Sequence, residues 1–419
     1  MRYVYLKANN AVSEYNNIRN SNLKHSSGAE SFLNDFLRFT DGEPTLVLSL
    51  HTHPKYNEYI KHNNVYIKSY YRHSNYNFYL IRFIGQIIHH LLISWRIFFN
   101  IIKFRPDYIL CWSRSFPHWA CFLSAKITKS HFTFSRHISF IKSQNSFISN
   151  FISKIDISLL KKADNVLVHG PYLKELSMTE GVQNNKTIMF DCIYDVNSTW
   201  QIRDQNVRHM CLQKHTDNDI NILFIGRMIK EKGIFDLMVA YKNICIDFNN
   251  VKLQFAGIGS DFQKLQHMIE YFELQSHVYL LGLVSQFDLP EIISKSYCVV
   301  APTQSIFPEG RCMAAMEGLV LGKPVIAPNF GPFPYLVHHG INGLLYKADC
   351  VTDLQSCLYT IVHDGELYIR LQQGAHESRK DILANKQGYF EALAETLLPL
   401  DVKMTPVIGM GANKPSSLS

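Results

Sequence analysis

Short runs of apolar residues alternate with longer amphipathic segments along the chain. The short runs are rich in Val, Ile and Tyr, which favours buried strands, and the segments between them have the length of helices. We predict strands at residues 2–7, 45–50, 108–112, 131–135 and 165–170 in the first half, and at 220–226, 251–257, 277–282, 298–303 and 323–328 in the second. Strands that alternate with helices are typical of parallel sheets, so the pattern predicts an α/β protein with two doubly wound domains.

The two halves are separated by a polar stretch that has neither the helical nor the strand period. We place the N-terminal domain at residues 1–200, a linker at 201–219 and the C-terminal domain at 220–385. A helix-prone segment at 386–400 follows and could return to the N-terminal domain. Residues 401–419, which end in GMGANKPSSLS, have the composition of a flexible tail.

Size and composition fit this plan. The 419 residues are 47% hydrophobic and 18% charged, which is enough for two sizeable cores. The first residues, MRYVYLKANN, have no apolar run with a cleavage site, so we expect no secretory signal. The nine cysteines are scattered and never spaced as C-x-x-C, and we interpret them as reduced thiols of a cytoplasmic protein.

Basic residues are concentrated in the first half. Residues 1–170 hold 21 Lys/Arg and 9 Asp/Glu, a net +12, which leaves −5 for the rest of the +7 total. The most apolar stretch, 78–102, is interrupted by charged and histidine side chains and is not predicted to span a membrane. It is predicted as a helix whose apolar face either packs on the sheet or meets an anionic membrane surface. That face carries Ile84, Ile87, Ile88, Leu91, Leu92 and Trp95.

Candidate chemistry lies where predicted strands of the second half end, because ligands of open parallel sheets bind at the carboxyl ends of strands. One strand stops at Gly226, and Arg227 and Lys232 then flank a short loop. An Arg fork and a Lys point charge suit a diphosphate, although two solvated surface charges give the same pattern. The next strand ends in GIGSDF, which is either the start of a dinucleotide fingerprint without its third glycine or a tight turn.

The segment FPEGRCMAAMEGLVLGKPVIA, residues 307–327, places Glu309 and Glu317 eight positions apart. Proline and Gly310 break the chain before a helix that we predict from about Arg311. The backbone N–H groups at its start favour an anion, and they belong to Arg311, Cys312 and Met313. Two buried carboxylates without a partner are costly, so a phosphate between two hydroxyl-rich groups would explain both glutamates. A sugar nucleotide has that chemistry.

These motifs resemble glycosyltransferase family 4, which comprises retaining enzymes of the GT-B fold. In the second half the resemblance is carried by GRMIKEKG, the E-x7-E segment and GKPVIA, and in the first half by SGAE (27–30), RPDYILCW and KKADNVLVHG. It covers most of residues 25–346. The resemblance implies two Rossmann-like domains that face each other across a cleft and an enzyme of the hexosyltransferase type.

The resemblance also implies roles for single residues. Arg227 and Lys232 would bind the donor diphosphate, Glu309 the transferred sugar and Glu317 the ribose. Two positions come from the first domain: Gly28 would allow the backbone to approach the phosphates or the acceptor, and His137 would stand beside the transferred sugar. Departures from the family pattern occur at Ser27, Gly318 and 189–196, and the first and last of these concern the acceptor side and the geometry of the first domain.

We therefore expect transfer of a sugar from a nucleoside diphosphate sugar to a glycan or a lipid-diphosphate-linked glycan, in surface polysaccharide biosynthesis. The expected location is the cytoplasm or the inner face of the cytoplasmic membrane. No cofactor or nucleic acid is expected, and no metal, since His51 and His53 lack a third ligand nearby. The alternatives are a sugar-nucleotide epimerase on the same fold, a nicotinamide-dependent dehydrogenase and a non-catalytic polysaccharide-assembly protein.

Overall fold

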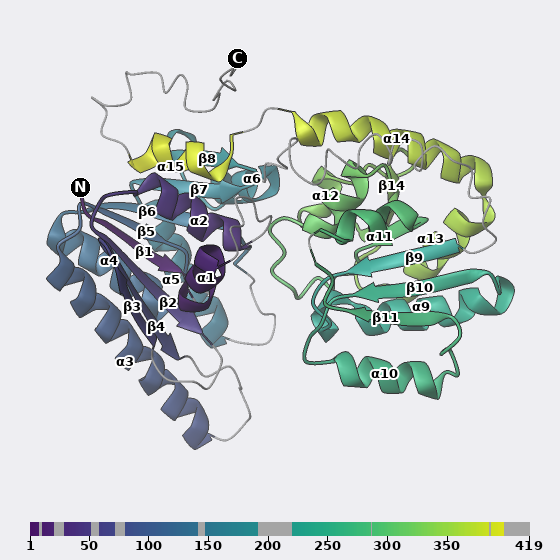
Figure 1. Cartoon of the computed structure of the whole chain (residues 1–419), viewed down its shortest axis with the longest axis horizontal. Helices are drawn as coiled ribbons and strands as arrows, with labels where there is room; N and C mark the ends of the chain where they lie inside the picture. The colour runs from purple at the N-terminus through teal and green to yellow at the C-terminus, as the bar shows by residue number, and fades with distance from the viewer. Residues whose placement is uncertain are drawn as a thin grey trace, which may run out of the picture.

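Two parallel sheets flanked by helices form the two halves of the molecule (Figure 1). The computed structural model describes residues 1–7, 11–20, 29–51, 58–71, 80–140, 147–191, 220–285, 287–384 and 387–397. The proposed linker at 201–219 and the tail at 401–419 lie outside these ranges. Each sheet has its own hydrophobic core on both of its faces.

The first sheet has eight strands in the order β3-β4-β2-β1-β5-β6-β7-β8. All neighbouring strands are parallel except β3 and β4, which form an antiparallel hairpin at one edge. Asn63 makes the hairpin turn with φ 51°, a left-handed conformation that asparagine tolerates. The strands are β1 (Tyr3–Lys7), β2 (Thr45–His51), β3 (Glu58–His62), β4 (Val65–Tyr71), β5 (Tyr108–Cys111), β6 (His131–Arg136), β7 (Asn165–His169) and β8 (Thr187–Phe190).

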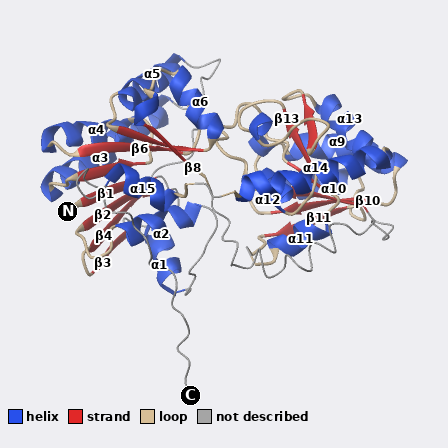
Figure 2. Ribbon diagram, turned by 90° about the horizontal axis from the view of Figure 1, so that it is seen from above, coloured by secondary structure: helices blue, strands red, loops and turns tan. Residues whose placement is uncertain are grey.

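Helices cover both faces of the first sheet, because successive residues of each strand point to opposite sides. Val4 and Leu6 of β1 face one core, and Tyr3 and Tyr5 face the other. The first core is closed by α3 (Leu80–Phe104), α4 (Phe116–Thr128), α5 (Phe147–Lys161) and α6 (Pro171–Thr179). The second is closed by α1 (Ala11–Asn20), α2 (Ala29–Phe39) and, from the far end of the chain, α15 (Tyr389–Leu397). Figure 2 shows the two layers on either side of the strands.

The second sheet has six parallel strands in the order β11-β10-β9-β12-β13-β14. Its strands are β9 (Ile220–Ile225), β10 (Val251–Ala256), β11 (Val278–Gly282), β12 (Cys298–Val300), β13 (Val325–Pro328) and β14 (Gly343–Tyr346). Its helices are α9 (Ile234–Asp247), α10 (Phe262–Tyr271), α11 (Leu289–Lys295), α12 (Met313–Val320), α13 (Val351–His363) and α14 (Gly365–Leu383). The strand order reverses between β9 and β12, and doubly wound sheets bind ligands at such a switch point.

All ten predicted strands are present, although β12 ends at Val300 rather than at residue 303. Four strands were not predicted: β3, β4, β8 and β14. The predicted start of the helix near Arg311 is wrong by two residues, because α12 begins at Met313 and Cys312 is its N-cap residue. The helix-prone segment after residue 386 contains α15, which packs on α2 and β8.

Candidate functional site

The loop after β9 carries two of the predicted cations and is fixed by a glycine. Residues Lys230–Lys232 form one short 3-10 turn that ends at Gly233, whose φ is 73°. A Cβ at Gly233 would lie 1.8 Å from the carbonyl oxygen of Pro302, which follows β12. Only glycine therefore allows the loops after β9 and β12 to touch, and this contact brings Lys232 to the segment that holds the first glutamate.

The glycine turn after β10 supports the same loop. A Cβ at Gly257 would lie 1.9 Å from the carbonyl oxygen of Gly226. Asp261 accepts a hydrogen bond of 2.9 Å from the backbone N–H of Lys230. The pKa of Asp261 is lowered, mainly by its hydrogen bond with Lys264, so the carboxylate is charged when it holds the loop. Of the two interpretations of GIGSDF, the structure therefore supports the tight turn.

Lys232 and Glu309 form an ion pair across the switch point of the sheet. The ammonium group donates to Oε2 of Glu309, and the two side chains are only 16% and 10% exposed. Thr303 donates to the same carboxylate oxygen over 3.5 Å. The cationic groups of Lys232 and Arg227 lie 4.3 and 5.4 Å from the ring centroid of Phe307, within the range of cation–π attraction. Three of the four charged residues of the predicted donor site thus form one cluster.

Glu317, the fourth, is buried in the middle of α12. Burial raises the pKa of its carboxyl to about 8. Its carboxyl has no hydrogen-bond partner among the residues that the structure describes. Cys312 lies near both glutamates: burial raises its pKa to about 12, and the charge of Glu309 and, more weakly, that of Glu317 add to this. A buried carboxyl without a partner is costly in a free protein and can accept hydrogen bonds from a ligand.

The side chain of Arg311 crosses to the first domain. It donates from Nε to Oδ1 of Asp191 over 3.2 Å and from Nη2 to Oδ2 over 2.7 Å, and both side chains are 3% exposed. The stem of Arg311 passes over Gly170, where a Cβ would lie 3.1 Å from its Cδ. The sequence predicted only a backbone role for Arg311, so this link between the domains is new information from the structure.

Gly310 brings the carboxyl edges of the two sheets into contact. A Cβ at Gly310 would lie 2.0 Å from the carbonyl oxygen of His137, the residue after β6. The His137 side chain is buried between Trp112 and Phe32, with ring centroids 4.0 and 4.6 Å away, and its Nε2 lies 2.8 Å from Oγ of Ser135. Burial lowers the pKa of His137 well below its ordinary value, so the ring is neutral at pH 7.

The other predicted positions are less informative. Gly28 and His53 lie outside the described residues, as does the side chain of His51. No group of three His, Cys, Asp or Glu side chains within the described ranges could hold a metal ion. The seven cysteines in those ranges are free thiols.

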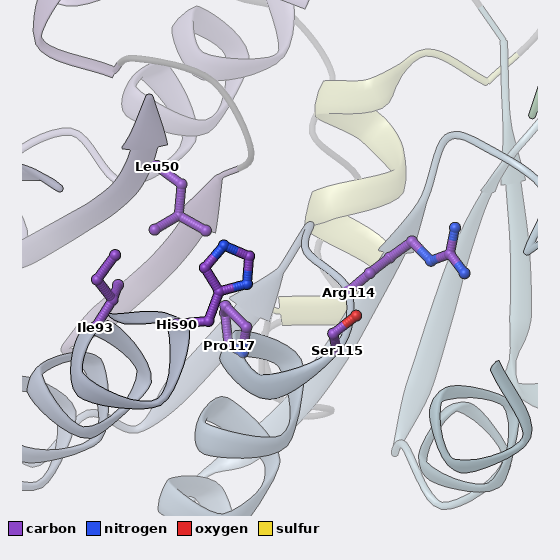
Figure 3. A pocket seen from close by; sticks show the side chains of 6 residues that line it. All are labelled: Leu50, His90, Ile93, Arg114, Ser115 and Pro117. Atoms are coloured by element: carbon purple, nitrogen blue, oxygen red, sulfur yellow. The ribbon is translucent and has the colours of Figure 1, made fainter. Parts of the chain in front are cut away.

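One pocket lies entirely in the first domain (Figure 3). It is small and is lined by Leu50, His90, Ile93, Arg114, Ser115 and Pro117. The guanidinium group of Arg114 points away from the other lining side chains (Figure 3). The pocket therefore presents little charge and is separate from the cluster at the switch point of the second sheet.

Sequence reasoning missed two residues of the site. Phe307 contacts both cations, and its only sequence signal is an aromatic residue directly before the Pro-Glu-Gly turn. Asp191, the partner of Arg311, lies in the stretch 189–196 that departs from the family pattern, so no motif pointed to it.

Comparisons with known proteins show similarity to glycosyltransferases. The family described as glycosyl transferases group 1 matches residues 212–378, which include all four charged residues of the predicted donor site. An uncharacterized glycosyltransferase of Methanocaldococcus jannaschii is 32% identical over 167 residues, 40% of this chain and 45% of that protein. A second one from the same organism is 25% identical over 363 residues, 82% of this chain and 88% of that protein. The chain thus spans about half the length of the first relative.

Two further matches concern named proteins. Poly(ribitol-phosphate) alpha-N-acetylglucosaminyltransferase of Staphylococcus aureus is 25% identical over 168 residues, 39% of this chain and 33% of that protein. The structure of Anabaena HepE in complex with UDP and glucose superimposes with a TM-score of 0.64 at 16% identity, over 95% of this chain and 99% of that one. The fold is therefore GT-B, with two Rossmann-like domains, and together with the matched family these comparisons support a glycosyltransferase.

Proposed function

We propose that the protein is a retaining glycosyltransferase of family 4 that transfers a sugar from a nucleoside diphosphate sugar to a glycan or a lipid-diphosphate-linked glycan. The observation that carries this proposal is the cluster at the switch point of the second sheet. There Lys232 pairs with Glu309, and the cationic groups of Lys232 and Arg227 both lie near the ring of Phe307. The cluster combines two cations with a carboxylate, which matches a diphosphate joined to a sugar.

The cations would act on the leaving group. Breaking the bond between the sugar and the diphosphate increases negative charge on the phosphate oxygens, and fixed cations stabilise that transition state more than the ground state. Lys232 has three N–H donors, so it can keep Glu309 and still reach a phosphate oxygen. Arg227 is exposed and can approach the same phosphates from the loop. On this proposal the two side chains supply the charge that a metal ion supplies elsewhere, so no metal or cofactor is required.

The two glutamates would bind different parts of the donor. Glu309 lies beside Lys232 and would accept hydrogen bonds from hydroxyl groups of the transferred sugar. Glu317 lies two turns further along the chain, buried and without a hydrogen-bond partner among the described residues, and would accept from the ribose hydroxyls. Backbone N–H groups at the start of α12, from Met313 onward, would face the phosphates between them.

Retention of the anomeric configuration is proposed from the resemblance and from the state of two side chains. Glu309 is paired with Lys232, so one of its carboxylate oxygens is already engaged by a cation. His137 is neutral and buried, and can donate or accept a hydrogen bond at the sugar. Neither is positioned as a strong base that would activate an acceptor from the opposite side of the sugar.

The acceptor and the location are also part of the proposal. The S. aureus relative is named for transfer of N-acetylglucosamine to poly(ribitol phosphate), a phosphate-bearing polymer, which supports a polymer acceptor and the proposed role in surface polysaccharide biosynthesis. We place the enzyme in the cytoplasm, at the inner face of the membrane.

Incubation of the purified protein with a panel of sugar nucleotides tests the proposal. We expect one donor to raise the melting temperature and to be hydrolysed slowly, and proton NMR of the transfer product should show the configuration of the donor. Conversion of the donor to its epimer would favour the epimerase alternative. Binding of no sugar nucleotide would contradict the proposal and favour the assembly protein.

A further inference from the structure

Helix α3 is apolar on two opposite sides. With 3.6 residues per turn, Ile93, Ile97 and Ile101 fall on one row, and all three are buried in the core of the first domain. The opposite side is also apolar but is 46–62% exposed. We call it the outer face of α3, and it consists of Ile88, Leu91, Leu92, Trp95 and Phe99.

The sequence left open whether the apolar face of this helix packs on the sheet. Packing on the sheet is the wrong interpretation for Ile88, Leu91, Leu92 and Trp95, which are exposed. The opposite row of the helix is buried in the core instead. Ile87 is half-buried, and the side chain of Ile84 lies outside the described residues.

The outer face presents large side chains in a dense arrangement. The rings of Trp95 and Phe99 meet edge to face with centroids 4.7 Å apart. The neighbouring helix α4 exposes two more aliphatic side chains, Leu123 and Ile127. Soluble proteins rarely expose apolar groups this close together unless a partner covers them.

The charge around the outer face identifies the partner. Arg96 and Lys103 are exposed on the same helical row as Leu92 and Phe99. Neither α3 nor α4 contains an acidic residue. Residues 59–155 hold 13 Lys/Arg and a single acidic residue, Asp107. An apolar face bordered by cations fits a bilayer with acidic lipids, whereas a second copy of this chain would place like charges opposite each other.

The helix lies along the domain surface. By length and composition, Ile87–Phe104 is apolar enough to cross a membrane, and 22% of that window is buried. Crossing would remove Ile93, Ile97 and Ile101 from the core and separate α3 from α4. An amphipathic helix held in this way inserts its outer side chains into the interface region of a bilayer and does not span it.

We propose that the outer face of α3 docks the first domain on an anionic lipid bilayer. His90 and Ile93 share a pocket with Leu50, the penultimate residue of β2, so the outer face begins level with the carboxyl end of that strand (Figure 3). The bilayer would lie beside the edge where parallel sheets bind ligands. This placement rests on the proposed function in one respect: it assumes that a lipid-linked acceptor reaches the sheet from the bilayer at this edge.

Co-sedimentation of the full chain with vesicles tests the proposal. We expect binding to vesicles of phosphatidylglycerol and phosphatidylcholine, and binding to pure phosphatidylcholine weaker by roughly tenfold or more, because the cations contribute only on an acidic surface. High salt should reduce the difference. L92E and W95E should each lower binding to acidic vesicles at least about tenfold. The matched control is I246E, an exposed apolar position on α9 of the second domain.

Two results would overturn the proposal. One is equal binding of I246E, L92E and the unchanged chain, with circular dichroism showing that all three are folded. The other is a dimer in sedimentation velocity without vesicles that L92E converts to a monomer, which would assign the outer face to a second copy. Hydrolysis of a sugar nucleotide in solution is read separately, so failure to bind vesicles and failure of the donor site are distinguishable.

Discussion

Arg311 of the second domain and Asp191 of the first are joined by two hydrogen bonds between side chains that are almost fully buried. Arg311 lies between Glu309 and Glu317, so the same short segment that contributes to the donor site also holds the domains together. His169 is close by, with Nε2 4.0 Å from Asp191, and its pKa is lowered to about 4, chiefly by burial, so it stays neutral beside the pair at pH 7.

Removing one partner of this pair should destabilise the protein strongly. In Asp191→Ala the guanidinium group of Arg311 would be buried without its anion, and we expect the free energy of unfolding to fall by about 3–5 kcal/mol. The matched control is Glu175→Gln, which changes an exposed contact between the domains, where Tyr335 donates to Glu175 over 2.6 Å. That change should cost about 1 kcal/mol or less. Urea unfolding measures the free energy of unfolding of both variants. Equal losses would show that the buried pair contributes no more to stability than the exposed contact does.

A side chain at Gly310 should separate the two sheets. In Gly310→Ala the added Cβ would collide with the backbone carbonyl of His137, which cannot move aside as a flexible side chain could. We expect a lower melting temperature and, if the domains part, a larger radius of gyration in small-angle X-ray scattering. Gly365→Ala, at the start of α14 with open space around it, is the control and should leave both values unchanged. An unchanged Gly310→Ala protein would mean that the contact is not required in solution.

Loss of either donor-site cation should slow sugar transfer without unfolding the protein. Lys232→Ala and Arg227→Ala each remove a charge aimed at the leaving diphosphate, and we expect turnover to fall roughly a hundredfold. Lys230→Ala is the control, because this exposed lysine lies in the same loop and carries the same charge. Steady-state kinetics with the donor identified in the panel provide the measurement. A fall of similar size in Lys230→Ala would indicate a general effect of loop charge rather than specific contacts.

Nucleotide affinity should depend on the protonation of Glu317. Burial raises its pKa to about 8, so the free protein holds the carboxyl largely protonated at pH 7. Ribose hydroxyls donate best to the ionised form, and binding to it must displace the proton. The association constant should therefore rise, by at most tenfold per pH unit, as pH increases from 7 towards 8, and it should level off above about pH 9.

Calorimetric titration of the nucleoside diphosphate between pH 7 and 9 measures this dependence. In Glu317→Gln the affinity should be lower and independent of pH over the same range, which also controls for titration of the phosphate. A wild-type affinity without pH dependence would exclude an ionised Glu317 as the ribose ligand.

Much of the fold could be predicted because buried parallel strands appear in the sequence as continuous apolar runs. Strands such as Val4 to Leu6 and Leu223 to Ile225 have neighbours on both sides and helices on both faces, so every position favours an apolar residue. Of the four strands that were missed, three lie at sheet edges: β3, β8 and β14. The fourth, β4 (VYIKSYY), lies beside the edge strand β3, and its apolar run is interrupted by Lys68 and Ser69.

The loops of the second domain were predictable for a related reason. The motifs place four charged residues at fixed distances after strand ends: Arg227, Lys232, Glu309 and Glu317. Because those strand ends meet at one edge of the parallel sheet, the sequence predicts that the four residues lie close together. Contacts between the domains have no such signal: Arg311 and Asp191 are 120 positions apart. The two sides of α3 were also beyond pattern analysis, because Leu92 and Ile93 are equally apolar and only tertiary packing decides which one is covered.

The return of α15 to the first domain has a consequence for the order of folding during synthesis. Tyr389, Leu393 and Leu397 belong to the same core as Tyr3 and Tyr5, so one face of the N-terminal sheet, although α1 and α2 cover part of it, is not fully covered until α15 has left the ribosome. The strands and helices of the second domain run without interruption from Ile220 to Leu383 and are complete earlier. N-terminal domains generally fold first, but here the part of the chain made first is the part that is finished last.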